Sequence, residues 1–271
     1  VARDVTREQE MASAMRRCVA VERVPDAATA VDALLAAADA GAAVAWVRNT
    51  VDDAIAAAAL LAARGAEPML FHARFAMGDR LAIEQQVLRR FGKHAAPAER
   101  QGRILVATQV IEQSLDLDFD LMVSDLAPAD LVIQRAGRLW RHPGRARVLP
   151  GSRLLLLAPE PVEDPPAGWL GEALRGTGFV YADLALLWRS ARALLGAGHI
   201  VTPDNIRALV EAAYSRGLIH LRLGEPKTAL DDFARVLAAY PNFRAVYLER
   251  ARVYIAQNEP AKALADLDRY L

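Results

Sequence analysis

The chain has 271 residues, 54% of them hydrophobic and 24% charged, and its 33 basic residues balance 33 acidic ones. Such a composition describes a globular chain of one large or two modest domains and excludes a disordered tail or a collagen-like chain. The longest apolar run, Ala54 to Ala63, is well short of the roughly 20 residues that cross a bilayer, and no signal peptide is visible. The single cysteine, Cys18, allows no internal disulfide and no cysteine-based metal site, so we expect a cytoplasmic protein without a membrane span.

Short apolar runs alternate with helical patterns over residues 1–212. Near-continuous apolar runs are typical of strands that are buried on both faces. Because helices lie between these runs, the pattern predicts an α/β fold, a parallel sheet with helices on both faces. The expected strands cover residues 44–47, 69–71, 104–107, 121–123 and 154–157.

The helical patterns carry their own end signals. Asp26 and Asp79 stand where N-caps belong, and Gly41 and Gly92 stand where C-caps belong. The expected helices cover residues 26–40, 52–63, 79–91, 130–138 and about 181–195, and a further helix follows Pro203-Asp204.

From about residue 210 the chain repeats itself. The segment from Gly224 to Phe233 recurs as Asn258 to Leu267, an offset of 34 residues. That period is typical of a helix-turn-helix solenoid, and the segment resembles the tetratricopeptide repeat. We therefore predict two domains: an α/β domain at 1–212 and an all-α, tetratricopeptide-like segment at 213–271 whose second repeat is incomplete.

An arginine motif lies in a stretch without acids. Between Asp130 and Glu160 the chain holds six arginines and no aspartate or glutamate. Within this stretch, Arg138 and Arg141 have a spacing that would place both guanidinium groups on one face of a helix, where they could clamp a transferring phosphoryl group. The alternative interpretation is a basic helix that lies on its own protein or in solvent.

A second signal lies at the end of an expected strand. Thr108 directly follows the run from Ile104 to Ala107. Ligands of open α/β sheets bind at the carboxyl ends of parallel strands. Thr108 and the arginine motif would therefore open onto the same edge of the sheet.

Taken in chain order, these motifs resemble the second RecA-like lobe of superfamily 2 helicases, and most closely that of the helicase-nuclease of CRISPR type I interference. The resemblance covers about residues 20–212. Ser114 stands where many superfamily members have glycine, and this departure fits the CRISPR subgroup. The segments that carry the resemblance are Trp46 to Val51, Leu70 to Phe75, Ile104 to Asp118, Leu126 to Pro128 and Gln134 to His142.

The resemblance implies roles for individual residues. Arg138 and Arg141 would be arginine fingers facing ATP. The loop beside the phosphates would be shaped by Gln134 and Gly137, and Asp116 would touch the nucleotide sugar or the coupling network. ATP and Mg²⁺ would be the cofactors only together with a first lobe that is not present in this chain, and the CRISPR surveillance complex would be a partner. The phosphates of single-stranded DNA would be contacted, without base reading, by Asn49, Thr50, His72, Arg74 and Thr108.

Several of these residues have a plainer interpretation. His72 could be a strand-end histidine that is hydrogen-bonded within the lobe. Asn49-Thr50 could cap the next helix, and Trp140 could pack on a neighbouring helix instead of stacking on a base. Glu112 and Asp118 could belong to a solvated acidic loop.

The motifs of the first helicase lobe are not in the sequence. It contains no Gly-x-x-x-x-Gly-Lys-Ser/Thr loop, no Asp-Glu-x-His box and no histidine-aspartate cluster of the kind expected for the family's nuclease domain. Because the chain also begins with Val1, we expect it to be a piece of a longer protein. We also expect no appreciable ATPase, unwinding or nuclease activity from this chain alone.

The leading hypothesis is therefore the second motor lobe of a CRISPR-type DNA helicase joined to a short repeat segment. The rival is a non-catalytic scaffold, in which a degenerate lobe supports repeats that bind a protein or peptide partner. A third hypothesis, another superfamily 2 DNA or RNA helicase, differs in its nucleic-acid substrate.

Overall fold

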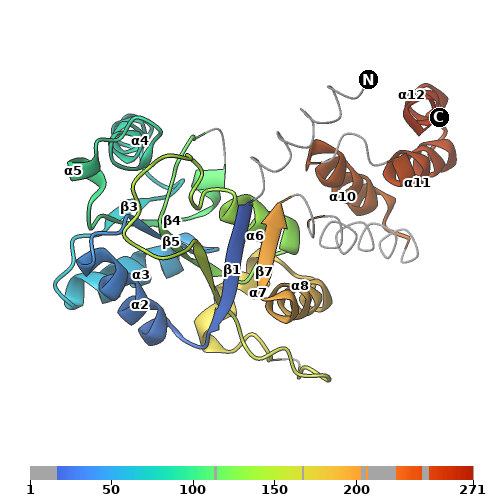
Figure 1. Ribbon diagram of the computed structural model, residues 1–271. Coiled ribbons are helices and arrows are strands. Elements are labelled where there is room, and N and C mark those ends of the chain that lie inside the picture. The colour runs from blue at the N-terminus through green and yellow to red at the C-terminus, as the bar shows by residue number, and fades with distance from the viewer. Residues whose placement is uncertain are drawn as a thin grey trace, which may run out of the picture. The chain divides into compact units, whose positions relative to one another are not determined.

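A computed structural model describes residues 17–112, 115–166, 168–202, 206, 224–239 and 244–270. The chain divides into two units, Val1–Ile206 and Arg207–Leu271, which are described separately (Figure 1). The predicted boundary at 212/213 and the predicted helix after Pro203 lie outside the described residues. Within the described residues, no helix is long and apolar enough to cross a membrane.

The first unit is built on one seven-stranded sheet with the order β3-β4-β2-β5-β6-β1-β7. Each expected strand is present, and β2, β4 and β5 are buried along their whole length. This burial matches their near-continuous apolar sequences. The expected strands are β2 (Val44–Val47), β3 (Met69–Phe71), β4 (Ile104–Ala107), β5 (Leu121–Asp125) and β6 (Arg153–Leu157).

Two strands were not expected from the sequence. β1 (Arg17–Val24) lies between β6 and β7, and β7 (His199–Thr202) pairs with it antiparallel. The predicted parallel sheet is therefore confirmed, with one antiparallel pair at this edge. β1 buries Val19, Val21 and Val24 while its polar residues stay at least partly exposed, so it lacks the continuous apolar run that marks the central strands.

Helices cover both faces of this sheet (Figure 1). Helix α2 packs on α3 and on β5, while α6 packs on α8 and on β5. The helices and 3₁₀ turns of the unit are α2 (Ala27–Asp39), α3 (Val51–Ala63), α4 (Met77–Phe91), α5 (Pro97–Arg100), η1 (Gln109–Glu112), α6 (Ala129–Ala136), η2 (Glu172–Leu174), α7 (Arg175–Val180) and α8 (Leu184–Ala197).

The predicted cap residues mark the helix ends correctly at Asp26 and Gly92 and incorrectly at Asp79. Asp26 caps α2 as expected, since its carboxylate accepts a hydrogen bond from the Thr29 backbone N–H at 2.8 Å. The prediction for Asp79 is wrong: α4 begins at Met77 after Ala76, so Asp79 lies in the first turn, where a carboxylate favours the helix dipole. Gly92 ends α4, and a Cβ there would lie 2.3 Å from the Leu88 carbonyl oxygen, so no larger residue fits.

The second unit consists of the helices α10 (Pro226–Ala239), α11 (Arg244–Ala256) and α12 (Pro260–Tyr270). Ala229, Phe233 and Ala263 are buried, which agrees with the packing positions of the predicted repeat, and the assignment to the tetratricopeptide repeat stays a prediction. Asn258 and Gly224, the equivalent positions of the two repeats, both have left-handed backbones, with φ of +60° and +75°. This confirms that Asn258 replaces glycine in the same turn. The predicted turn at Tyr240-Pro241-Asn242 lies outside the described residues.

Candidate functional site

The carboxyl ends of the central strands bring together several of the predicted nucleic-acid residues. The Thr108 backbone N–H donates to the Phe71 carbonyl oxygen at 3.2 Å, which joins the ends of β4 and β3. The Gln109 side chain donates to the Asn49 carbonyl oxygen at 2.8 Å, which joins the ends of β4 and β2. Thr108 is buried, and its hydroxyl makes no hydrogen bond to a described residue. This edge of the sheet is therefore one continuous structure, as the sequence predicted.

Asn49 and Thr50 are engaged within the lobe. The Asn49 amide donates to the Leu126 carbonyl oxygen at 2.8 Å and to the Thr177 hydroxyl at 2.9 Å. Thr50 is the N-cap of α3, because its hydroxyl accepts from the Asp53 backbone N–H. The capping interpretation therefore holds for Thr50, and Asn49 holds the strand end against the segment that carries α7. A nucleic-acid contact by either residue stays a prediction.

His72 and Arg74 differ in exposure. His72 is buried and its ring stacks on Phe75, with centroids 4.1 Å apart. Burial and the nearby Arg74 guanidinium lower the pKa of His72, so the ring is held neutral. Arg74 is exposed and forms an ion pair with Asp52 at 2.6 Å. Of these two side chains, only that of Arg74 is displayed to solvent as a cation.

The two predicted arginine fingers do not share a helix face. Helix α6 ends at Ala136, and Gly137 is its C-cap. A Cβ at Gly137 would lie 3.1 Å from the Gln134 carbonyl oxygen, so this position favours glycine. Gln134 is exposed in the last turn of the helix. Arg138 and Arg141 follow in an irregular segment in which Trp140 has a φ of +47°. The prediction of one helix over 130–138 is thus wrong at its carboxyl end.

Both arginines instead contact residues that follow η1, namely Leu115 and Asp116, and Arg138 also contacts Glu112 at the end of η1. Arg138 donates to the carbonyl oxygens of Glu112, at 3.1 Å, and Leu115. Arg141 forms an ion pair with Asp116 at 2.6 Å, in which both side chains are partly exposed. Although burial opposes ionisation of Asp116, the Arg141 hydrogen bond and the neighbouring His142 lower its pKa overall. The motif that follows β4 and the arginine motif therefore form one site.

Arg135 is a further member of this site that the sequence did not single out. It is fully buried, and its guanidinium contacts Glu112 at 2.7 Å, Ser124 at 2.9 Å and Asn49 at 3.1 Å. These partners come from the η1 segment, β5 and the end of β2. Because one rigid, planar group holds three strand connections, Arg135 fixes the geometry of the whole edge.

The site offers cationic donors, and the described residues include no cluster of metal ligands. Arg138 and Arg141 offer fork-shaped donors of the kind that recognise phosphate oxygens. In the described part of the chain, however, no group of three or more histidine, cysteine, aspartate or glutamate side chains could hold a metal. The predicted Mg²⁺ therefore has no ligand set among these residues. Together, the sheet, its carboxyl edge and the adjacent arginine segment define a RecA-like helicase lobe.

Comparison with known proteins identifies the family. The family model of the C-terminal part of the CRISPR-associated nuclease/helicase Cas3 matches residues 40–144. The chain is 36% identical over 205 residues to the CRISPR-associated endonuclease/helicase Cas3 of Escherichia coli (strain K12), which is 73% of this chain and 21% of that relative. The chain belongs to the Cas3 family, and its first unit is the family's C-terminal RecA-like lobe.

Solved structures agree with this assignment. The structure of T. fusca Cas3 with ATP matches 80% of this chain with a TM-score of 0.64 and 31% identity, over 27% of its own length. A CRISPR RNA-guided surveillance complex in a pre-nicking state contains a chain that matches 82% of this one, over 28% of its own length, with a TM-score of 0.64 and 30% identity. The present chain thus spans between a fifth and a third of the length of these relatives.

Proposed function

We propose that this chain is the second motor lobe of an ATP-dependent DNA helicase of CRISPR type I interference. The observation that supports this most directly is the contact of Arg138 and Arg141 with the segment 112–118. In this arrangement, the residues that would sense the nucleotide lie on the segment that continues from Thr108. Binding or hydrolysis of the γ-phosphate would therefore shift the strand ends that would hold DNA.

The Arg141 ion pair is suited to exchange. Its two side chains are 40% and 45% exposed, and exposed ion pairs contribute only about 0–1 kcal/mol. A γ-phosphate brought by the first lobe carries more charge than Asp116, so Arg141 can leave the carboxylate at low cost. Arg138, which is bonded to backbone carbonyls, would stabilise the charge that develops on the transferring group. ATP would supply the phosphoryl group when both lobes are present.

Single-stranded DNA would lie across the carboxyl edge. Arg74 offers an exposed cation, and the Thr108 hydroxyl offers a donor without an internal partner among the described residues. His72, Asn49 and Thr50 would act mainly by holding the strand ends in place, with contacts to the DNA backbone as a further role. Such contacts are independent of sequence, which suits a motor that passes any base.

ATP hydrolysis, DNA unwinding and nuclease activity would all depend on regions outside this chain. ATP hydrolysis needs a phosphate-binding loop and an acidic magnesium box, and neither occurs in the sequence. The same holds for the nuclease cluster. We infer that the isolated chain does not hydrolyse ATP. DNA-dependent ATP hydrolysis by the purified chain, lost in the Arg138→Ala variant, would contradict that inference. A surveillance complex as partner is a proposal that rests on the Cas3 relative found in one.

Binding to a fluorescent oligo(dT) tests the motor hypothesis with the chain as it is. The dissociation constant should rise with salt concentration, because phosphate contacts release counterions. Arg74→Ala should weaken binding about threefold to fivefold, corresponding to the loss of one exposed charge contact. Asp52→Asn, which frees Arg74 from its partner, should strengthen binding or leave it unchanged, and Lys227→Ala in the other unit is the matched control. No binding at low salt would refute the proposal.

A second candidate function is a protein-binding scaffold. The helices α11 and α12 expose Ile255 (60%), Leu264 (64%) and Tyr270 (37%), which are apolar positions that a partner could cover. A scaffold needs no nucleic-acid contact. Capture of a partner that depends on Leu264, combined with no salt-dependent DNA binding, would favour the scaffold over the motor.

A further inference from the structure

A cavity of about 910 Å³ lies at the amino edge of the sheet, where the parallel strands begin. Asp120 immediately precedes β5, Gln101 precedes β4, and the loop from His142 to Val148 leads to β6. We call this cavity the amino-edge pocket. It lies at the opposite end of the strands from the Thr108 edge. No residue that lines it takes part in the proposed function, but it adjoins the Arg141 segment: the Arg141 backbone N–H donates to Asp118 at 2.9 Å, and His142 lies 3.4 Å from Asp116. The remaining lining residues are Gly41, Lys93, His94, Ala95, Pro97 and Arg100.

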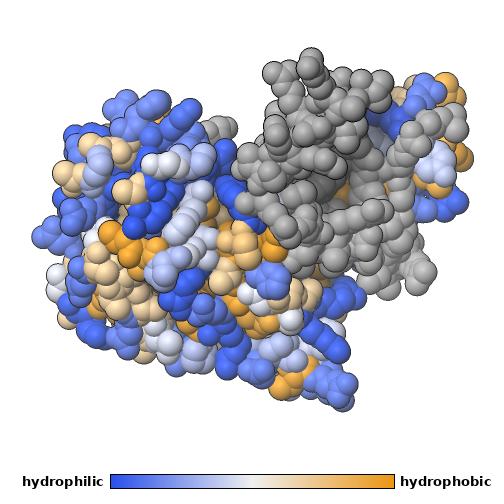
Figure 2. Space-filling view, viewed as in Figure 1, coloured by the Kyte–Doolittle hydropathy of each residue, from blue (hydrophilic) through white to orange (hydrophobic). Residues whose placement is uncertain are grey.

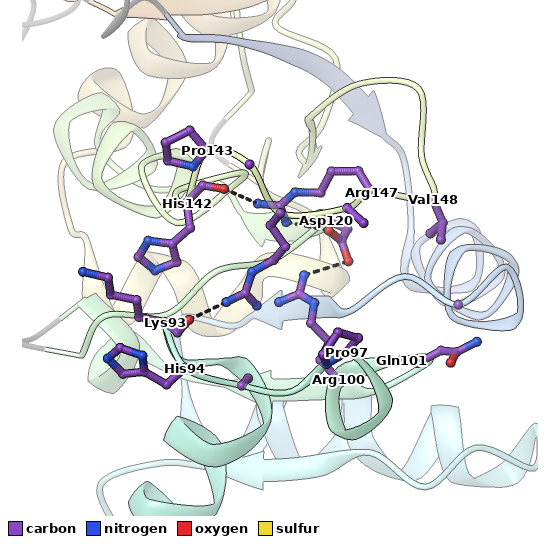
Figure 3. A pocket seen from close by; sticks show the side chains of 15 residues that line it. Lys93, His94, Pro97, Arg100, Gln101, Asp120, His142, Pro143, Arg147 and Val148 are labelled. Carbon is purple, nitrogen blue, oxygen red and sulfur yellow. Dashed lines mark hydrogen bonds and ion pairs between the residues drawn. The ribbon is translucent and has the colours of Figure 1, made fainter.

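The floor of the pocket is a fixed cluster of charges. Arg147 donates to Asp120 at 2.6 Å and to Asp118 at 2.9 Å, and Arg100 donates to Asp120 at 2.8 Å. The side chains of these four residues are at most 8% exposed. Figure 3 shows Arg100 and Arg147 converging on Asp120. Because each guanidinium is held by carboxylates, this part of the pocket is rigid before any ligand enters.

The cations in this cluster outnumber the carboxylates. Arg145 also contacts Asp118, at 3.1 Å, and donates to the Lys93 carbonyl oxygen at 2.7 Å, yet its buried Nη1 atom has no acceptor. The Lys93 ammonium forms no hydrogen bond or ion pair with any described residue. Three arginines and Lys93 thus face two aspartates, a formal excess of two positive charges. A buried guanidinium donor without an acceptor is costly, so the cluster favours an added anion.

We propose that the amino-edge pocket binds a phosphate group of a nucleotide, held between Lys93 and the Arg145 side of the cluster with His94 and His142 at its rim. A phosphate monoester carries about −1.5 to −2 charges at neutral pH, which matches the excess of two cations. A carboxylate would leave one cation unmatched. Figure 3 shows Lys93, His94 and His142 toward the same end of the opening.

The shape of the pocket also fits a nucleotide. Its volume lies within the range of small-molecule sites, about 300–1,000 Å³. Pro97, Pro143 and Val148 provide apolar walls beside the charged floor. No phenylalanine, tyrosine or tryptophan side chain lines the pocket, so recognition would rest on the phosphate more than on the base. The source of the phosphate is either a free nucleotide or a nucleic-acid strand.

Histidine NMR of the full chain tests this inference, because His94 and His142 line the pocket whereas His72 and His199 do not. The chain, labelled with ¹³C at histidine, is titrated with inorganic phosphate, thymidine 5′-monophosphate, thymidine and an unphosphorylated oligonucleotide. The two phosphate compounds should move the signals of His94 and His142 and leave His199 unmoved. If the oligonucleotide moves the same two signals, two neighbouring phosphodiesters of a strand supply the two charges; if only the monophosphates do, the source is a free or terminal phosphate.

Two results would overturn the inference. Thymidine could move His94 and His142 as much as its monophosphate does, or phosphate could move His142 without His94, as binding at Arg141 would do, because His142 lies 3.4 Å from Asp116. Lys93→Ala should weaken monophosphate binding about fivefold, the scale of one partly exposed charge contact. Lys227→Ala, an exposed lysine in the other unit, should leave it unchanged. Equal affinity of wild type and Lys93→Ala would also reject the site. Because Lys93 belongs to no internal ion pair, this variant should keep its fold.

Discussion

Replacing Arg135 tests whether one buried guanidinium holds the functional edge together. In Arg135→Met the side chain keeps a similar length and loses its charge. Glu112, which is 2.7 Å from Arg135 and only 11% exposed, then keeps its charge without its partner. Asn49 loses the donor to its side-chain oxygen at 3.1 Å. Breaking a buried pair on one side typically costs about 3–5 kcal/mol, so we expect a loss of this size in the free energy of unfolding.

Urea unfolding followed by tryptophan fluorescence measures this loss in the right place. All four tryptophans belong to the first unit, so their fluorescence does not report unfolding of the second unit. They are Trp46, Trp140, Trp169 and Trp188. Arg64→Ala is the control, because it removes an exposed ion pair with Asp32 at 2.9 Å, which should contribute no more than about 1 kcal/mol.

A double variant separates charge from packing. If the unpaired Glu112 carboxylate causes most of the loss, Arg135→Met with Glu112→Gln should recover part of it, and the cycle should give a coupling energy above about 1 kcal/mol. The reasoning is refuted if Arg135→Met costs no more than Arg64→Ala. It is also refuted if the double variant is as unstable as the two single losses added together.

Three further predictions follow from backbone geometry and charge. Gly92→Ala should destabilise the first unit by about 1–3 kcal/mol in the same urea experiment, because the new Cβ would lie 2.3 Å from a carbonyl oxygen; an unchanged midpoint would contradict this. Asn258→Ala should lower the melting temperature of the helical unit, measured by circular dichroism, since its φ of +60° costs alanine about 1 kcal/mol, whereas Asn258→Gly should not. Arg153 donates to Glu22 and holds the pKa of that carboxyl below its ordinary value. The stability gained is present above the ordinary glutamate pKa and is lost as the pH falls through the lowered value, so Glu22→Gln should flatten the acid side of a plot of melting temperature against pH.

The sequence predicted the centre of the sheet better than its edge. β2, β4 and β5 are covered on both faces, so their continuous apolar runs reflect their environment directly. β1 and β7 lie at one edge and mix apolar with polar residues without a regular alternation, which is a weaker signal over so few positions. Asp79 shows a different limit, since an acid in the first turn and an N-cap look alike when the start of the helix is uncertain by two residues.

The site was predicted in position and only partly in detail. Thr108 stands at the end of a buried strand, so its place on the carboxyl edge follows from topology alone. Arg135 could not be singled out by its charge, because an arginine in a basic motif is expected to face solvent or bind a phosphate, not to be buried. The helical period did hold a signal: Val132 and Ala136 on the same helix are buried, and Arg135 lies one turn from Val132 on that face.

The acid-free arginine stretch is where sequence and space differ most. Along the chain it has no carboxylate, yet in the structure three of its arginines meet acids of the segment 112–120 in order: Arg135 with Glu112, Arg141 with Asp116, and Arg147 with Asp118 and Asp120. Arg153 pairs with Glu22 of β1 instead. The order matches because the stretch runs beside the segment 112–120, with Phe119 and Leu139 bridged in parallel. A neutralised stretch cannot act as a general basic patch. Any anion that it binds must displace a particular carboxylate, as at Arg141, or use the cations in excess, as at Lys93 and Arg145. Anion binding is therefore restricted to these positions and is not spread along the stretch.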